Sequence, residues 1–424
     1  MIIYTVKQGD NLGDIARRFS VSLRELENIN GIFGDILMPG TSLVVPTENT
    51  AHVVNKGDSL YSIALGSGTT VDELLKLNPN LRFPYTIYPG EYIITPPEKK
   101  LGEIEVNGYC YPTIRPEVLN GWLPSLTYLS IFSHRLNPDG SIDGISDDAL
   151  IATAKEANTA PLCVVTNTNQ NGGFDSDTAE QFLTNSEAVE RFLNEISDFL
   201  KRKGYLGINM DLEYIPPSVR EAYNEFLARL SERLGAEGLI FTTAIAPKQS
   251  DTQVGTLYEA HDYATHGKYA DRIIIMTYEW GYIAGPPLAV APLNEVEKVL
   301  RYAVSRIPRE KILMGMPNYG YDWTLPYREG TFARPVTSNS ALNLAILNRS
   351  EIGYNPSSDA PNFTYRDSKG DEHIVWFDDA RSYEARLKLI SALDLGGASF
   401  WTINNLFSAG LYVLNSLYTV KKLL

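Results

Sequence analysis

Cysteine is scarce in this chain, which has 424 residues but only two cysteines, Cys110 and Cys163. A framework of several disulfides is therefore excluded. Both cysteines fall in predicted strands, so we expect buried structural thiols, with a single bond between the two as the alternative. A chain of this length with 44% apolar residues can build a large core without covalent staples, and its length favours about three domains.

Long apolar runs and excess positive charge are also missing. No stretch of about 18 apolar residues occurs, so we predict no transmembrane helix. The first residues lack the basic and apolar regions of a secretory signal, and we expect no cleaved Sec signal peptide. The formal charge of −14 argues against nonspecific binding to nucleic acid or to an acidic membrane surface. The five histidines show no metal-ligand spacing, and we predict neither a metal nor a cofactor.

The first hundred residues contain one pattern twice, with residues 4–16 matching residues 52–64. Each copy begins with a short alternating strand and continues with two short helical patterns. A Pro-Gly turn and a closing strand complete it. Asp10 and Asp58 stand just before the first helical pattern, where a helix N-cap is expected. The two predicted βααβ units span residues 1–47 and 50–97.

These repeats resemble LysM modules, which bind the N-acetylglucosamine of peptidoglycan or chitin. The resemblance is carried by the Gly-Asp-x-Leu start, a central Asn and the Pro-Gly-x-x-Leu/Ile close, in both copies. It implies a sugar groove between the first strand–helix loop and the loop before the last strand. Helix capping and core packing in a small repeat are the alternative roles for the same positions. The implied glycan-binding residues are Asp10, Asn11, Leu12, Asp58, Ser59 and Leu60.

From residue 101 onward, short β-rich runs alternate with helical patterns over about 320 residues. The eight predicted strands span residues 104–111, 126–132, 161–166, 207–214, 239–246, 272–278, 312–317 and 398–403. This alternation predicts a (β/α)8 TIM barrel over residues 101–424, in the α/β class. A doubly wound sheet is the alternative, but no Gly-x-Gly-x-x-Gly follows a strand. Residues 322–380 are too many for a loop and predict a small α+β insertion between strands seven and eight.

Three polar side chains, Asn209, Asp211 and Glu213, alternate along the fourth predicted strand. They therefore point to one face, about 6–7 Å apart, while the apolar residues between them face the covering helices. Carboxylates aimed into a barrel cost free energy unless they are hydrogen-bonded or used. At the carboxyl end of a barrel strand they predict catalysis. A like charge on Asp211 would raise the pKa of Glu213 and keep it protonated as a general acid. A hydrogen-bonded structural pair is the alternative.

The segment ending at Glu213 resembles the strand-four signature Asp-Gly-x-Asp-x-Asp-x-Glu of glycoside hydrolase family 18, the chitinase-like enzymes. Leu206 and Asn209 depart from its first two aspartates. Because Asn209 cannot titrate, we expect Asp211 to stay ionised at lower pH. The segments that resemble the family's strands six, seven and eight span residues 274–280, 314–320 and 396–401.

The family resemblance implies a retaining mechanism in which the substrate's own acetamido carbonyl attacks C1. In this scheme Glu213 is the acid/base, Asp211 orients the acetamide and Tyr278 donates a hydrogen bond to its oxygen. The implied substrate-binding residues are Asn209, Met276, Glu279, Trp280, Tyr319 and Trp401.

Two LysM modules before such a barrel resemble the spore cortex-lytic N-acetylglucosaminidases of the YaaH/SleL type. This resemblance implies hydrolysis of cortical peptidoglycan or its fragments during germination. It also implies a location at the coat/cortex boundary of the spore, consistent with export without a Sec signal. A chitinase or an endo-N-acetylglucosaminidase is the alternative enzyme. A glycan-binding lectin or spore coat protein is the alternative without catalysis.

Overall fold

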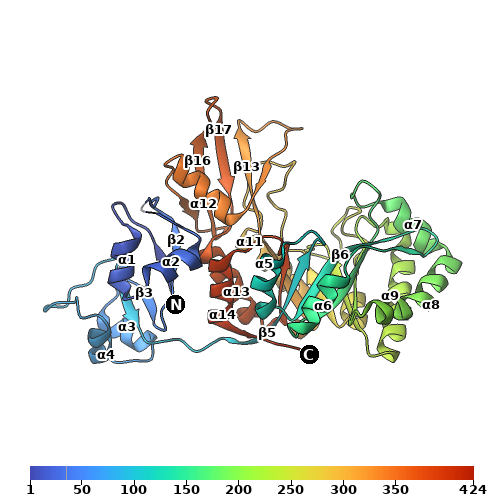
Figure 1. Ribbon diagram of the computed structural model, residues 1–424, viewed down its shortest axis with the longest axis horizontal. Helices are drawn as coiled ribbons and strands as arrows, with labels where there is room; N and C mark the ends of the chain where they lie inside the picture. Colours follow the sequence, from blue (N-terminus) through green and yellow to red (C-terminus); the bar gives the residue numbers. More distant parts are fainter. Residues whose placement is uncertain (35) are drawn as a thin grey trace.

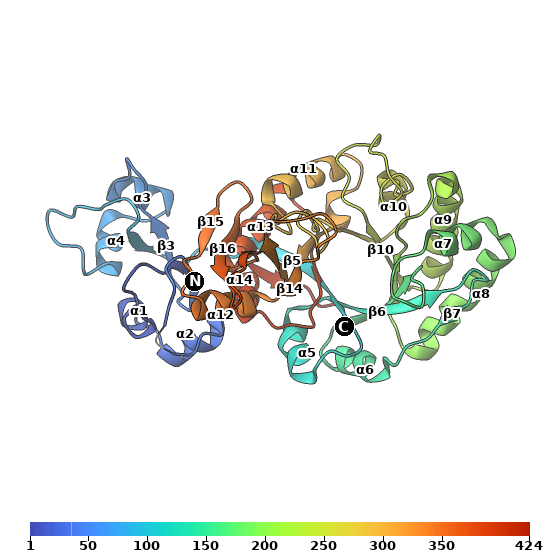
Figure 2. The same ribbon diagram turned by 90° about the horizontal axis from the view of Figure 1, so that it is seen from above.

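The computed structural model describes residues 1–34 and 36–424, with two small repeats at one end and a closed barrel at the other (Figures 1 and 2). In each repeat the two strands pair antiparallel. The helices pack on them through the periodic apolar residues that the sequence pattern identified. The first repeat contains β1 (Ile2–Thr5), α1 (Leu12–Phe19), α2 (Leu23–Asn30) and β2 (Ser42–Val45). The second contains β3 (Thr50–Val53), α3 (Leu60–Gly66), α4 (Val71–Leu77) and β4 (Tyr92–Thr95).

The N-caps of the first helices differ from the prediction by one residue. Asn11 caps α1 and Ser59 caps α3, each accepting a backbone N–H from the first turn. The aspartate before each cap instead closes the preceding turn: Asp10 accepts the backbone N–H of Lys7, and Asp58 makes the equivalent bond. The prediction was wrong because an aspartate can serve a turn as well as a helix end, and the sequence pattern does not separate the two.

The first repeat is packed against the helices of the barrel domain. Its α2 and β2 lie on α13 (Ala380–Leu393) and α14 (Ser408–Leu417). The guanidinium of Arg381 donates to the carbonyl of Gly40 at 3.0 Å, and the N–H of Ile352 donates to the carbonyl of Pro39 at 3.0 Å. A Cβ on Gly40 would lie 1.8 Å from the Ile352 oxygen, so only glycine permits this approach. The first repeat is therefore a fixed extension of the barrel domain.

Eight parallel strands close into a barrel, which confirms the predicted fold (Figure 2). They pair in chain order, and the last pairs with the first. The strands are β5 (Gly102–Cys110), β6 (Tyr128–Leu136), β8 (Ala160–Thr166), β9 (Gly207–Asp211), β10 (Ile240–Ile245), β11 (Arg272–Ile275), β12 (Ile312–Pro317) and β18 (Gly397–Trp401). Two short strands, β7 (Ile142–Asp143) and β19 (Tyr418–Val420), add to β6 and β5.

Helices surround the barrel and bury the outward-facing apolar side chains of its strands. They are α5 (Pro116–Trp122), α6 (Asp148–Glu156), α7 (Ser176–Thr184), α8 (Ser186–Lys203), α9 (Arg220–Ala236), α10 (Tyr263–Tyr269) and α11 (Leu293–Ala303), together with α13 and α14. No helix in the described part of the chain is long and apolar enough to cross a membrane.

The predicted insertion is a five-stranded antiparallel sheet with one helix, and it projects from the barrel (Figure 1). Its sheet order is β14-β13-β17-β16-β15. The elements are β13 (Gly320–Leu325), β14 (Arg334–Val336), α12 (Ser338–Leu347), β15 (Gly353–Asn355), β16 (Ala360–Arg366) and β17 (Glu372–Trp376). Because β13 begins just after β12 ends, the insertion stands at the carboxyl end of the barrel strands.

The two cysteines are free and buried, so the predicted structural thiols are found and no bond joins them. Cys110 lies on β5 and Cys163 on β8, with Ile131 of β6 between them in register. Burial raises the pKa of the Cys110 thiol to about 12, which keeps it protonated and unreactive.

Five barrel strands end earlier than predicted, and the difference is largest for β9 and β11. β9 ends at Asp211 and β11 at Ile275, each three residues before its predicted end. Shortly beyond these ends the backbone turns left-handed, with φ of 54° at Tyr214 and 70° at Glu279. A strand cannot hold such a conformation, and it is uncommon for residues with a side chain. Glu213 therefore lies beyond the hydrogen-bonded ladder of the barrel.

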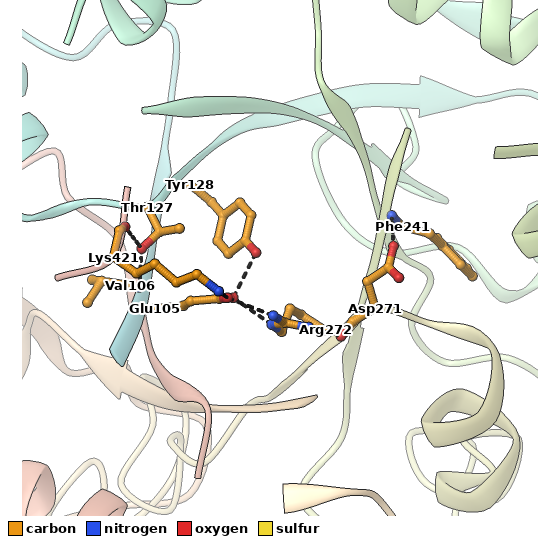
Figure 3. A network of polar contacts seen from close by, with 8 residues as sticks. All are labelled: Glu105, Val106, Thr127, Tyr128, Phe241, Asp271, Arg272 and Lys421. Carbon is orange, nitrogen blue, oxygen red and sulfur yellow. Dashed lines mark hydrogen bonds and ion pairs between the residues drawn. The ribbon is translucent and has the colours of Figure 1, made fainter. Parts of the chain in front are cut away.

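A polar network closes the opposite, amino-terminal end of the barrel (Figure 3). Glu105 of β5 accepts hydrogen bonds from Arg272 of β11, Tyr128 of β6 and Lys421 near the C-terminus. Burial alone would raise the pKa of Glu105, but the bonds from Arg272 and Tyr128 outweigh it and lower the pKa. Glu105 thus ties together strands that are not neighbours in the sheet.

We expect Glu105→Ala to destabilise the protein by about 1–3 kcal/mol at pH 7, because the partly buried guanidinium of Arg272 and the buried hydroxyl of Tyr128 lose their acceptor. The folded-state pKa of Glu105 is lowered, so its contribution is full above the unfolded value near 4.5 and is lost as pH falls through the folded value. Urea unfolding of wild type and Glu105→Ala at pH 7 and at pH 3 measures the difference in the free energy of unfolding and its dependence on pH. Glu103→Ala, an exposed change on the same strand, is the control. An equal loss of stability in both variants would contradict the role of the network.

Candidate active site

A cavity of about 830 Å³ opens at the carboxyl end of the barrel strands. Its wall is mainly aromatic and acidic, and among the described residues that line it there is no lysine, arginine or histidine. No group of three metal-ligating side chains occurs in residues 1–34 and 36–424. The aromatic lining residues are Tyr109, Phe174, Tyr214, Tyr258, Tyr278, Trp280, Tyr282, Tyr319 and Trp401, and the acidic ones are Asp211, Glu213 and Glu279.

The structure gathers eight of the nine predicted barrel-site residues around this cavity. They come from the ends of four strands and the loops that follow them: Asp211, Glu213, Met276, Tyr278, Glu279, Trp280, Tyr319 and Trp401. This convergence follows from the barrel itself, because all parallel strands end at the same rim.

Asn209 is the exception and lies inside the barrel wall, with none of its surface exposed. Its amide oxygen accepts the hydroxyl of Tyr109 at 2.8 Å, and its nitrogen donates to the hydroxyl of Thr242 at 2.8 Å. The predicted substrate contact is therefore wrong, because the amide is engaged by protein on both sides. Asn209 instead braces the strand that carries Asp211.

Burial dominates the electrostatics of the two carboxyls on this segment. It raises the pKa of Asp211 to about 7, and one oxygen of Asp211 has no hydrogen-bond partner among the described residues. The expectation that Asp211 stays ionised at lower pH compares Asn209 with an aspartate at the same position, so it stays a prediction. Burial also raises the pKa of Glu213, with smaller contributions from the charges of Asp211 and Glu279. The like-charge effect predicted from the sequence is present, but desolvation is the larger cause.

Glu279 holds a third carboxyl at the cavity. The hydroxyls of Tyr319 and Tyr321 both donate to it, the latter at 3.0 Å. Burial raises the pKa of Glu279, and the hydrogen bonds from the two tyrosines oppose that shift. Tyr321 belongs to β13 of the insertion, so the insertion holds one of the acidic residues that line the cavity. Tyr321 was not predicted from the sequence, although it stands two residues after Tyr319.

Trp401 ends β18 and is held by three aromatic neighbours. Its ring meets those of Phe132, Tyr109 and Tyr111 edge to face, at centroid distances of 4.8, 5.4 and 5.9 Å. Such contacts favour one ring orientation. These neighbours were not predicted from the sequence, because an aromatic residue at a strand end gives no signal that separates core packing from a binding wall.

The predicted glycan-binding residues of the repeats have mixed surroundings. Leu12 and Leu60 are core residues, so their side chains pack inside the repeats, and a glycan would meet only the backbone at these two positions. Asp10, Asn11, Asp58 and Ser59 lie on the expected loop, but they are engaged in the turns and caps described above. Ile36 and Tyr88, on the loop before each closing strand, are 60% and 62% exposed and offer apolar surface to a sugar.

We expect Asn209→Asp to move the acidic limb of the pH–rate profile to higher pH. The new buried carboxyl would stand two residues from Asp211 and raise its pKa further by like charge. If catalysis needs Asp211 ionised, activity is lost as pH falls through that pKa, and the loss would begin at higher pH in the variant. Profiles of kcat/KM on a soluble substrate measure this. Thr242→Val, which perturbs Asn209 without adding charge, is the control. A profile of Asn209→Asp identical to that of wild type would contradict the expectation.

Comparison with known families gives matches over most of the chain. Residues 168–405 match the family described as "Glycosyl hydrolases family 18", and residues 4–46 and 52–96 match "LysM domain". The "Cortical fragment-lytic enzyme" of Bacillus subtilis is 38% identical, with 100% of this chain and 99% of that protein covered. The "Cortical fragment-lytic enzyme" of Bacillus anthracis is 34% identical over 99% of both chains.

Solved structures give the same pattern. The spore cortex-lytic enzyme SleL of Bacillus megaterium is similar with a TM-score of 0.89 and 34% identity, covering 100% of this chain and 99% of that one. A chitinase from Chromobacterium violaceum has a TM-score of 0.70 and 24% identity, covering 74% of this chain and 99% of that one. The second likeness concerns the fold alone.

Proposed function

This chain belongs to glycosyl hydrolase family 18, and from this premise we propose that it is an N-acetylglucosaminidase of spore cortex peptidoglycan. It acts on the cortex glycan or on its fragments during germination. The observation that carries the proposal is the pair of carboxyls at the aromatic cavity, with Asp211 buried at the end of β9 and Glu213 partly buried just beyond it. The polymer is inferred from the full-length relatives, which are named for lysis of cortical fragments.

In the proposed reaction Glu213 protonates the leaving oxygen while the acetamido carbonyl of the −1 sugar attacks C1. Burial supports this role, because it favours the protonated form of Glu213. Asp211 accepts the acetamide N–H and stabilises the positive charge that develops on it. Tyr278 donates to the acetamide oxygen. Glu213 then activates the water that opens the intermediate, so the anomeric configuration is retained.

The charge of the cavity supports an uncharged glycan at the cleaved bond. Three carboxyls face the space without a lysine, arginine or histidine on its described wall. A saccharide with a free carboxylate next to the cleaved bond would meet like charge in a partly desolvated site. Aromatic walls, by contrast, suit the apolar faces of neutral sugar rings.

For the location, we propose the coat/cortex boundary of the spore. The names of the full-length relatives support a spore protein, and two LysM domains supply a means of retention on the glycan. Immunogold labelling of dormant spores tests this, and label confined to the mother cell would contradict it.

Product analysis of digested cortex tests the function. Muropeptides that end in reducing N-acetylglucosamine are expected. Cleavage of chitin oligomers with no action on cortex would favour the alternative chitinase. Tight binding of cortex without any new reducing ends would favour a lectin or coat protein.

A further inference from the structure

The backbone around Glu213 lies beyond the sheet, yet side chains hold four of its polar groups. The ladder between β8 and β9 ends with Thr166 opposite Asp211. The next backbone groups, on Leu212, Glu213 and Tyr214, are held by side chains from elsewhere in the chain. In place of strand pairing, side-chain amide, imidazole and hydroxyl groups fix the segment that carries the acid/base.

Asn167 makes the central contacts. Its amide oxygen accepts the N–H of Glu213 at 2.9 Å, and its amide nitrogen donates to the carbonyl of Glu213 at 2.8 Å. The nitrogen's second bond goes to the carbonyl of Asp175 at 3.0 Å. Asn167 is fully buried, directly follows β8, and directs its three side-chain bonds to backbone. The amide thus replaces the next rung of the β8–β9 ladder.

His261 holds the residue before Glu213. Its Nδ1 accepts the backbone N–H of Ala246 at 2.9 Å, so the proton of the neutral ring lies on Nε2, which donates to the carbonyl of Leu212 at 2.9 Å. The ring is buried, and burial lowers its pKa to about 4, which keeps it neutral. The ring therefore bridges the ends of β9 and β10. Ser176 adds a bond to the carbonyl of Tyr214 at 2.6 Å.

The same device occurs in the second repeat, away from the cavity. Asn78 accepts the N–H of Ile94 and donates to its carbonyl, both at 2.8 Å. There it fixes a strand of a small module. The Asn78 pair thus provides an internal control in which equivalent bonds exist but no reacting group is attached.

We propose that Asn167 is the positioning residue for Glu213, with His261 fixing the same segment from the other side. The side chain of a residue outside the ladder would otherwise move with its loop, and a displacement of about 1 Å can cost about 10²-fold in rate. Asn167 also bonds Asp175, next to the cavity residue Phe174, so it sets the distance between Glu213 and this part of the wall. This inference rests on the proposed function, since it takes Glu213 as the acid/base.

The test compares Asn167→Ala, Asn167→Asp and Asn78→Ala in the full chain, on soluble cortex fragments. We expect Asn167→Ala to lower kcat about 10²-fold with KM within about threefold. Asn167→Asp has the same shape but cannot donate to Glu213 or Asp175, and we expect a loss of at least 10-fold. Asn78→Ala should keep kcat within about twofold.

A second measurement needs no turnover. The pKa of Glu213, followed by carboxyl NMR, should fall toward its usual range in Asn167→Ala as the side chain gains water, and stay unchanged in Asn78→Ala. Folded Asn167 variants with wild-type kcat, or with an unchanged Glu213 pKa, would overturn the proposal. If wild type cleaves no glycan, the proposed function fails, while the NMR shift still decides whether Asn167 positions Glu213.

Discussion

Replacement of Glu213 by Gln is expected to lower turnover of cortex glycan by about 10³-fold and to leave glycan affinity within about twofold. The amide has the same shape but can neither protonate the leaving oxygen nor later accept a proton from water. Both half-reactions therefore lose their proton transfer. The variant leaves the aromatic wall of the cavity and the two repeats unchanged, and these are the surfaces proposed to bind glycan.

Steady-state rates on soluble fragments, together with sedimentation binding to whole cortex, separate the two effects. Glu221→Gln is a matched control, since it makes the same change on the exposed start of α9. It should alter neither rate nor binding. Turnover by Glu213→Gln within tenfold of wild type would remove Glu213 from the role of acid/base.

The barrel and the positions of its reactive residues were predictable from the sequence for a simple reason. Strand and helix periodicities fix the order of the elements, and a parallel barrel then brings every strand end to one rim. Alternation along residues 207–211 also placed Asp211 on the inner face, whereas Glu213 reaches the cavity from the turn beyond the strand. Both inferences use local sequence patterns, and each of these patterns is compatible with only one arrangement in the barrel.

What the sequence did not provide depends on contacts between distant residues. Asn209 was assigned to substrate because it stands at a position of the family signature, but Tyr109 and Thr242 engage its amide. Asn167 and His261 carry no motif, and they lie 46 and 49 residues from the groups they hold. Hydrogen bonding of this kind depends on loop geometry after the strands end, and no periodicity encodes it.

Replacement of Asp211 by Asn is expected to lower kcat by about 10²–10³-fold, the cost of removing one preorganised group from a desolvated site. The amide is neutral and cannot stabilise the positive charge that develops on the acetamide. The unpartnered oxygen of Asp211 makes this argument specific to the reaction, because in the described protein no hydrogen bond engages it. The carboxylate is therefore available to a substrate group.

The pH dependence of this variant distinguishes a charge effect from simple loss of structure. Burial raises the pKa of Asp211, so wild-type activity should be lost as pH falls through that raised value. In Asp211→Asn this acidic limb should disappear from the residual activity. The removal of a like charge should also lower the pKa of Glu213, so the basic limb, where Glu213 loses its proton, should move to lower pH. Asp198→Asn on the exposed face of α8 should shift neither limb. Removal of a charge next to Glu213 must shift the pKa of Glu213. If the residual profile of Asp211→Asn kept both limbs at their wild-type positions, Asp211 would act through packing alone.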